Sequence, residues 1–393
     1  MLIRKLSQPS SFGVYLLALL MLMINMEGCT PKMQPTSPPP ATHSPPTKIE
    51  QQAPVEKVNA KNIILLIGDG MGLAQITGGM YLNKNNTALE KFPVVGLHKS
   101  HSSDNLITDS ASGATAFSIG EKSFNGAIGV AADGKPKETI LEEAEKRGLA
   151  TGMLATSSIV HATPAAFIAH VPDRRQYEDI ALYFLRTPID IFIGGGRSYF
   201  TRREDGRDLY QELQGKGYVI ADYLGQSIAQ VDISTDLNFA YFTADKEPLP
   251  VLSGRDYFVP ATHKILDYLS HRGDNGFFLM IEGSQIDWGG HANDAKYVLS
   301  EFKEFNIVID ICFEFAKRKG NTLVVVTADH ETGGFTIIPE STMNELKVSF
   351  STGDHTAVMI PVFAYGPGSD RFAGIYENNT IFRKMREAYG WSK

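Results

Sequence analysis

The chain is poor in cysteine: its 393 residues contain only Cys29 and Cys312. Two cysteines are too few for a disulfide framework. The sequence also lacks a long basic run, and its formal charge is −7. We therefore expect no nucleic-acid partner. A phosphorylated substrate stays open, because bound cations reverse the local field of an acidic protein.

Long hydrophobic runs are scarce as well. The run at residues 14–24 has 11 residues, whereas a membrane-spanning helix needs about 20. Arg4 and Lys5 precede it, so we interpret residues 1–28 as a signal peptide. Gly28 and Cys29 resemble the end of a bacterial lipobox, in which the cysteine becomes lipidated. We expect an exported protein, either periplasmic or anchored at the outer membrane or cell surface through Cys29, with simple secretion as the alternative.

No internal repeat is present, and one segment lacks the apolar residues needed for folding. Residues 29–59 are rich in Pro, Thr, Gln and Ser, which predicts a disordered tether. The chain as a whole has 43% hydrophobic and 21% charged residues, an ordinary globular balance. We therefore expect one catalytic domain over residues 60–393.

Within that domain, apolar strands alternate with helices. The continuous apolar character of the strands favours an α/β fold: a three-layer α/β/α sandwich with a central, mainly parallel sheet. Residues 197–260 show no clear period, and we interpret them as an inserted subdomain. We expect strands at 63–67, 150–155, 189–193, 277–281, 322–327 and 358–365, and helices at 139–148, 262–271, 293–319 and 380–389.

Ligand-type residues follow three of the predicted strands. Asp69 comes after strand 63–67, and Asp329 and His330 come after strand 322–327. A further carboxylate and imidazole, Asp287 and His291, follow strand 277–281. An α/β fold places its chemistry at strand ends, and two histidines with a carboxylate are typical of an open zinc site. The pattern therefore indicates a metal cluster, to which His355 is a further candidate ligand.

Two of these segments have alternative interpretations. The glycines around Asp69 could form a nucleotide-binding loop, but Leu73 stands where the third glycine of that fingerprint belongs. Ser110 is followed by small residues and should lie in the first turn of a helix, where a bound phosphate is favoured. From this segment alone, helix capping by Asp109 or Ser110 is the simpler interpretation.

Together, these motifs resemble the alkaline phosphatases over nearly all of residues 60–393. Six segments match in the right order. They are IGDGMG (67–72), TDSA (108–111), ATPAA with the later DR (162–166 and 173–174), EGSQID with His291 (282–287), TADHETGG (327–334) and His355.

The resemblance implies a role for each matched position. Asp287, His291 and His355 would hold one Zn²⁺, and Asp69, Asp329 and His330 a second one that faces Ser110. Asp69, Thr163 and Glu282 would hold a Mg²⁺, and Arg174 would clamp the phosphate. The implied activity is hydrolysis of phosphate monoesters by way of a phosphoserine at Ser110. Such chemistry is reasonable because a nearby cation lowers the pKa of a serine hydroxyl, and paired metals stabilise entering and leaving oxygens.

The sequence departs from some relatives at three places. His161 stands where some bacterial members have Asp beside the Mg²⁺. Its imidazole could hydrogen-bond a metal-bound water or favour a softer ion such as Zn²⁺, and we expect weaker Mg²⁺ binding than with Asp. Trp288 stands where some relatives have a Lys or His that contacts phosphate through water; it either changes phosphate binding or only packs. Only 24 residues separate His330 from His355, which predicts a minimal crown insertion and leaves a homodimer open.

Three rival functions remain. A phosphodiesterase on the same metal scaffold is disfavoured by Arg174, Thr163 and Glu282, which suit a dianionic terminal phosphate. A sulfatase is disfavoured because no Cys or Ser has the Pro-x-Arg context of a formylglycine nucleophile. A non-catalytic lipoprotein that scavenges phosphate or metal would not need Ser110.

Overall fold

The computed structural model describes residues 58–342 and 344–391. The predicted signal peptide, Cys29 and all but the last two residues of the tether lie outside this part of the chain. No helix in the described residues combines the length and the apolarity that crossing a membrane requires.

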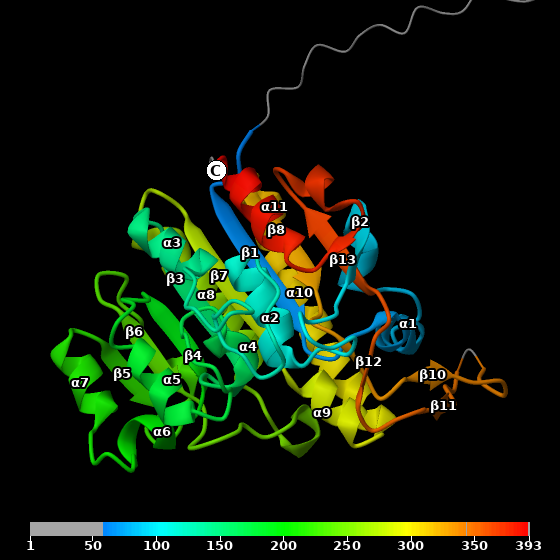
Figure 1. Cartoon of the computed structure of the whole chain (residues 1–393), viewed down its shortest axis with the longest axis horizontal. Coiled ribbons are helices and arrows are strands. Elements are labelled where there is room, and N and C mark those ends of the chain that lie inside the picture. Colours follow the sequence, from blue (N-terminus) through cyan, green and yellow to red (C-terminus); the bar gives the residue numbers. More distant parts are fainter. Residues whose placement is uncertain (1–57, 343, 392–393) are drawn as a thin grey trace, which may run out of the picture. The chain divides into compact units, whose positions relative to one another are not determined.

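The described chain is built on a ten-stranded sheet with the order β14-β2-β13-β8-β1-β7-β3-β4-β6-β5 (Figure 1). β13 alone runs antiparallel to its neighbours, β2 and β8. The expectation of a mainly parallel sheet is confirmed. The strands are β1 (Asn62–Gly68), β2 (Val94–Lys99), β3 (Ala150–Ser158), β4 (Ile191–Gly195), β5 (Val219–Asp222), β6 (Phe239–Phe242), β7 (Phe277–Gly283), β8 (Thr322–Thr327), β13 (Ile360–Tyr365) and β14 (Gly374–Glu377).

Helices cover both faces of this sheet. They are α1 (Leu73–Leu82), α2 (Ser110–Ile119), α3 (Ile140–Lys146), α4 (Ala162–Ala165), α5 (Tyr177–Tyr183), α6 (Ser198–Thr201), α7 (Leu209–Gly215), α8 (Phe258–Arg272), α9 (Gln285–His291), α10 (Ala295–Lys319) and α11 (Thr380–Tyr389). Four 3₁₀ turns accompany them: η1 (Ala88–Lys91), η2 (Ile228–Gln230), η3 (Val251–Ser253) and η4 (Ser369–Phe372).

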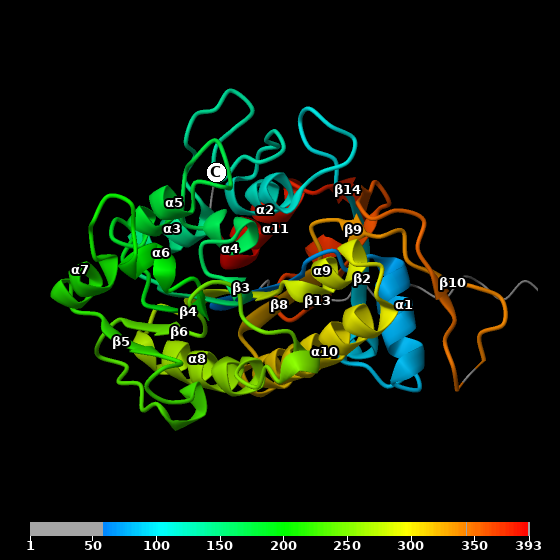
Figure 2. The same cartoon turned by 90° about the horizontal axis from the view of Figure 1, so that it is seen from below.

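The buried strand β1 shows why the fold has three layers. Successive side chains of a strand point to opposite faces. Ile63 and Leu65 pack into one core together with α2, α3 and α11, whereas Ile64 and Leu66 pack into another with α8 and α10. Figure 2 shows the two helix layers on opposite sides of the sheet. A strand that is buried on both faces has to be apolar throughout, as β1 is.

Two segments refine the sequence-based picture. Residues 197–260 contain β5 and β6, and β6 pairs with β4. This segment therefore extends the central sheet, which corrects its interpretation as an inserted subdomain. Among the described residues from His330 to Thr356, the chain forms only short two-stranded pieces, in keeping with a minimal crown: β9 (Glu331–Thr332) pairs with β12 (His355–Thr356), and β10 (Thr336–Ile337) pairs with β11 (Val348–Ser349).

Candidate active site and metal centre

The carboxyl ends of four neighbouring strands form the candidate site. β8, β1, β7 and β3 lie next to one another and run in the same direction (Figure 1). Asp69 follows β1, Glu282 lies near the end of β7, and Asp329 follows β8. His161 and Thr163 follow β3. Because parallel strands end at the same edge of a sheet, side chains far apart in the sequence meet there.

A first cluster contains Asp287, His291 and His355. His291 Nε2 is 3.1 Å from His355 Nε2, and each of these nitrogens is 3.5 Å from Asp287 Oδ1. The Nδ1 atoms of the two histidines face backbone carbonyls, those of Gly353 at 2.7 Å and Thr108 at 2.8 Å. Since a carbonyl oxygen only accepts, Nδ1 of each ring carries a proton, and Nε2 is the nitrogen that each ring turns toward the cluster as a candidate metal ligand.

A second cluster contains Asp69, Asp329 and His330, all fully buried. Ligand atoms of the three residues lie within 4.8 Å of one another. His330 Nε2 is 3.1 Å from Asp329 Oδ2 and 3.5 Å from Asp69 Oδ1. The hydroxyl of Ser110 lies 3.3 Å from the same Nε2 atom. The structure therefore places Ser110 beside this carboxylate–imidazole group.

The two clusters adjoin. The rings of His330 and His355 stack with their centroids 3.5 Å apart. Asp287, His330 and His355 also form a combination whose ligand atoms lie within 4.8 Å of one another. Two candidate ion positions are therefore neighbours, as an in-line displacement between two cations requires.

A third cluster contains Asp69, Glu282 and His161, again with ligand atoms within 4.8 Å. Thr163, which the resemblance implied as a ligand, is fully buried on α4, two residues after His161. Asp69 thus belongs to two clusters. The imidazole of His161 therefore lies among the candidate ligand atoms of this group.

Several buried polar atoms of the clusters lack a hydrogen-bond partner among the described residues. They include both carboxylate oxygens of Asp69, Oε1 of Glu282, Nδ1 of His161 and the hydroxyl of Thr163. A buried polar group without a partner costs about 1–3 kcal/mol, and a charged one costs more. So many such atoms converging on one point fit a bound cation, which would satisfy them together.

The electrostatics of the site also favour cations. Burial raises the pKa of Asp69 well above its ordinary value, and the neighbouring carboxylates raise it further. Burial likewise raises the pKa of Glu282 to about 7. Burial lowers the pKa of His161 to about 3, and the charge of Arg174 adds to this shift. Carboxylates packed this closely resist simultaneous ionisation unless positive charge is present.

Arg174 is connected to the helix that carries Ser110. Its Nη1 donates to Asp109 Oδ2 at 3.1 Å, and Asp109 caps α2 by accepting from the backbone N–H of Ser112 at 3.0 Å. Asp109 Oδ2, the atom that Arg174 contacts, also accepts from the backbone N–H of Gly126. The cap is therefore Asp109, and Ser110 is the first helical residue, whose hydroxyl does not take part in capping.

Ser110 and Arg174 open into a cavity of about 580 Å³. Its wall also includes His161, Trp288, His291 and His355. The rings of Trp288 and His161 meet edge to face with centroids 6.0 Å apart. Trp288 therefore both packs against His161 and faces the cavity.

Glycines allow the loops of the site to approach this closely. Gly70 has φ +70°, and a Cβ there would lie 2.7 Å from Asp287 Cα. A Cβ on Gly113 of α2 would lie 2.9 Å from the Cβ of Asp329. Larger residues would push α2 and the loops that carry Asp69 and Asp329 apart.

The sequence did not reveal two residues that touch the site. Asp109 appeared only as a capping candidate, although it also binds Arg174. Thr332 donates its hydroxyl to Asp287 Oδ1 at 2.5 Å. The contacts span 65 and 45 residues. No local pattern signals them, apart from the position of Asp109 beside Ser110.

Comparisons with known proteins agree with this geometry. A family model for alkaline phosphatase matches residues 60–347. The chain is 32% identical over 425 aligned positions to alkaline phosphatase 4 of Bacillus subtilis, covering 84% of this chain and 90% of that protein. A solved alkaline phosphatase from the Antarctic bacterium TAB5 superposes with a TM-score of 0.81 at 45% identity, covering 86% of this chain and 100% of that one.

Two further structures of the Antarctic enzyme carry a histidine replaced by glutamate or by aspartate, with magnesium bound in the M3 site. The similarity extends over the whole domain rather than over isolated motifs. With the matched family model and the converging metal-ligand groups, it establishes the kind of enzyme. The chain belongs to the alkaline phosphatase family and is a metal-binding phosphomonoester hydrolase.

Proposed function

We propose that Ser110 is the nucleophile of this hydrolase and that the three clusters hold two Zn²⁺ and one Mg²⁺. Asp287, His291 and His355 would hold one Zn²⁺, and Asp69, Asp329 and His330 the other. The Mg²⁺ would be held by Asp69, Thr163 and Glu282, with His161 beside it. The observation that carries the proposal is the Ser110 hydroxyl 3.3 Å from His330 Nε2, at the wall of the cavity that Arg174 lines.

The reaction would proceed in two displacements. Ser110 Oγ attacks the phosphorus atom, the ester oxygen leaves as the alcohol, and a phosphoserine forms. Water then attacks the same phosphorus, which releases inorganic phosphate and restores the hydroxyl. When bound, the metal ions would lower the pKa of the serine and stabilise the entering and leaving oxygens. The N-terminus of α2 adds a partial positive charge beside the phosphoryl group.

Arg174 supports a monoester over a diester. A guanidinium offers a planar pair of N–H donors that matches two oxygens of one phosphoryl group. The dianion of a monoester has three free oxygens, so Arg174 could hold two and leave one for the metal ions, whereas a diester held in the same way would have none left. The same argument favours a terminal phosphate as the substrate group.

The proposed function is tested by comparing a nitrophenyl phosphate monoester with the matching diester. We expect kcat/KM to be at least about 100-fold higher for the monoester, which corresponds to about 2.7 kcal/mol of transition-state stabilisation. Equal or reversed preference would favour the phosphodiesterase. Absence of both activities in the metal-loaded protein would favour a scavenging lipoprotein.

Replacing Arg174 by Ala should lower kcat/KM for a monoester by about 10- to 100-fold. Hydrogen bonds to a charged group contribute about 1.5–3 kcal/mol, and they would be lost here. Arg175 provides a matched control, because its side chain is 82% exposed and pairs with Asp173. Arg175→Ala should stay within about twofold of wild type in steady-state kinetics. Equal effects of the two replacements would refute the assigned role of Arg174.

Replacing His161 by Asp should tighten Mg²⁺ binding by about tenfold or more, or about 1.4 kcal/mol. Mg²⁺ prefers oxygen ligands, and an imidazole suits Zn²⁺ better. In the Antarctic enzyme, variants with a histidine replaced by Asp or Glu hold magnesium in the M3 site, in keeping with this direction. The measurement is a Mg²⁺ titration of zinc-loaded protein, followed by activity and by bound metal. His263→Asp is the control, since it adds a carboxylate at an exposed position of α8; an unchanged affinity in His161→Asp would contradict the prediction.

Export and assembly remain parts of the proposal. The basic and apolar N-terminal segment supports a signal peptide, and Cys29 supports a lipid anchor at the outer membrane or cell surface, with a soluble periplasmic or secreted form as the alternative. Mass spectrometry of the mature N-terminus would distinguish a diacylglyceryl cysteine from a free one. Light scattering of the soluble domain would show whether it forms a homodimer.

A further inference from the structure

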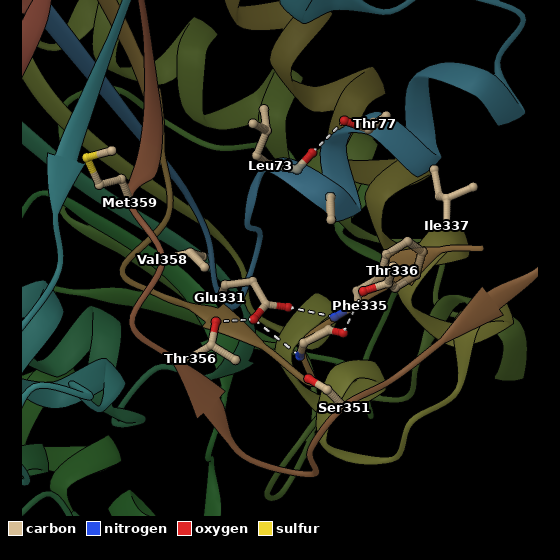
Figure 3. A pocket seen from close by; sticks show the side chains of 12 residues that line it. Leu73, Thr77, Glu331, Phe335, Thr336, Ile337, Ser351, Thr356, Val358 and Met359 are labelled. Carbon is tan, nitrogen blue, oxygen red and sulfur yellow. Dashed lines mark hydrogen bonds between the residues drawn. The ribbon is translucent and has the colours of Figure 1, made fainter. Parts of the chain in front are cut away.

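A buried carboxylate without an assigned role lies directly after the metal-ligand pair Asp329 and His330. Glu331 is only 3% exposed. It forms part of the wall of a second cavity, of about 600 Å³, which is otherwise lined mostly by apolar residues such as Leu73, Phe335 and Val358. Figure 3 shows Glu331 reaching toward Thr356 and the backbone beside Phe335. In the chain, Glu331 directly follows two ligands of the second cluster and precedes His355, a ligand of the first cluster.

Glu331 accepts four hydrogen bonds, two on each oxygen. Oε1 accepts from the side-chain amide of Gln75 at 2.6 Å and from the backbone N–H of Phe335 at 3.0 Å. Oε2 accepts from the backbone N–H of Gly334 at 3.2 Å and from the hydroxyl of Thr356. All four donors are neutral. Because two of them face each oxygen, the site requires a hydrogen-bond acceptor at both oxygen positions. Four donors compensate the burial of a carboxylate that has no cationic partner in this set.

These bonds tie Glu331 to the loop that carries Asp69. Gln75 lies in the first turn of α1, directly after that loop, and its amide also donates to the backbone carbonyl of Thr332 at 2.9 Å. Gly72 lies so close that a Cβ there would be 2.3 Å from Cγ of Glu331. The carboxylate therefore fixes the distance between the loop that carries Asp69 and β9.

The same carboxylate ties β9 to β12. In this short antiparallel pair, Glu331 faces Thr356, and Thr332 faces His355. The hydroxyl of Thr332 in turn bonds Asp287 Oδ1. A two-residue ladder is too short to hold its register alone. The Glu331–Thr356 hydrogen bond adds a side-chain contact across this ladder. His330, a ligand of the second cluster, directly precedes β9, and His355, a ligand of the first cluster, lies in β12.

We propose that Glu331 is a positioning residue that holds the loops of both zinc clusters in one arrangement, so that its loss weakens zinc binding at both. The inference rests on the zinc sites of the proposed function. Removing one loop-fixing contact near a metal site typically lowers metal affinity by about 10- to 100-fold. Ser110 and Arg174 do not touch Glu331, so the chemistry itself should recover once the metals are bound.

The test is Glu331→Gln, measured by competition with a chromophoric zinc chelator and by bound zinc per chain. An amide keeps the shape, but its NH₂ must face a fixed backbone N–H whichever way it is turned, that of Phe335 or that of Gly334. We expect the free zinc needed for half-occupancy to rise by at least tenfold at both sites. With saturating zinc, kcat should return to at least half of the wild-type value. Faster amide hydrogen exchange at Gly334 and Phe335 should accompany the change.

Glu301→Gln is the matched control. Glu301 is also 3% exposed, but it lies in α10 and its partners are Arg255 and the backbone N–H of Val251, which are not part of a metal-ligand loop. This variant should lose fold stability and keep its zinc affinity within twofold. Unchanged zinc affinity in Glu331→Gln, an equal loss in Glu301→Gln, or a low kcat at full zinc occupancy would each overturn the inference.

Two further measurements keep the test decisive. If Glu331→Gln does not fold, Thr356→Val removes only one of the four donors; a rise of at least threefold in half-occupancy zinc supports the role, and no rise overturns it. Zinc titration of the wild-type protein separates the two levels of the proposal. If the wild type binds no zinc at the ligands named above, the proposed function fails, whereas normal wild-type binding with an unaffected Glu331→Gln refutes only the role of Glu331.

Discussion

Replacing Ser110 by Ala should reduce turnover of a phosphate monoester by more than about a thousandfold, because the reaction loses its attacking atom. The hydroxyl lies beside His330 and is not a structural hydrogen-bond donor to the backbone, so the fold and the metal content should be preserved. Steady-state kinetics, together with bound-metal analysis of the same sample, would measure both effects.

Ser112 offers a control on the same helix. Its hydroxyl donates to the backbone carbonyl of Ser123 at 2.8 Å, so Ser112→Ala should cost about 1 kcal/mol of stability and change turnover only a few-fold. Labelled phosphate quenched at low pH should be trapped on Ser110 in wild type and in Ser112→Ala but not in Ser110→Ala. Retained turnover or retained trapping in Ser110→Ala would show that another group is the nucleophile.

Removing the metal ions with a chelator should abolish activity, again by more than about a thousandfold, and lower the melting temperature by several degrees. An ion whose free concentration is about 100 times its Kd adds about 2.7 kcal/mol to the free energy of unfolding, and this contribution disappears on chelation. The buried carboxylates of Asp69, Glu282 and Asp329 then face one another without the positive charge of the ions. Calorimetry and activity before and after chelation would record the two losses.

Readdition distinguishes the sites. Zinc alone should restore most of the melting temperature, and zinc followed by magnesium should restore the activity. Ser110→Ala should show the same loss of stability on chelation, because its metal ligands are intact. A melting temperature that does not respond to chelation would contradict the assignment of the three clusters as metal sites.

Much of the sheet could be predicted because its central strands carry strong local signals. β1, β7 and β8 are continuous apolar runs. α10 is preceded by the cap residue Asp294 and followed by Gly320, which has φ +72°. The reversed direction of β13 could not be predicted, since an antiparallel strand buried in the sheet has the same apolar composition as a parallel one. Residues 197–260 were misinterpreted because β5 and β6 have only four residues each, too few to show a period.

The candidate site could likewise be predicted only in part. Ligand-type residues at strand ends and in compact motifs, such as Asp69 or the pair Asp329 and His330, are visible in the sequence. The contacts that orient them are not, because they join distant segments: Asp109 to Arg174, and Glu331 to Gln75 across 256 residues. Such contacts depend on how loops pack after folding, and a single sequence carries no signal of that packing.

The double membership of Asp69 has a thermodynamic consequence. Its carboxylate belongs to the second cluster and to the third. An ion at one position changes the charge and the orientation of an oxygen donor that the other position uses. Whatever factor magnesium imposes on zinc affinity, zinc must impose on magnesium affinity, since linkage between two sites is reciprocal. The site would therefore fill as a coupled system, in which the concentration of either metal changes the occupancy of the other metal's position.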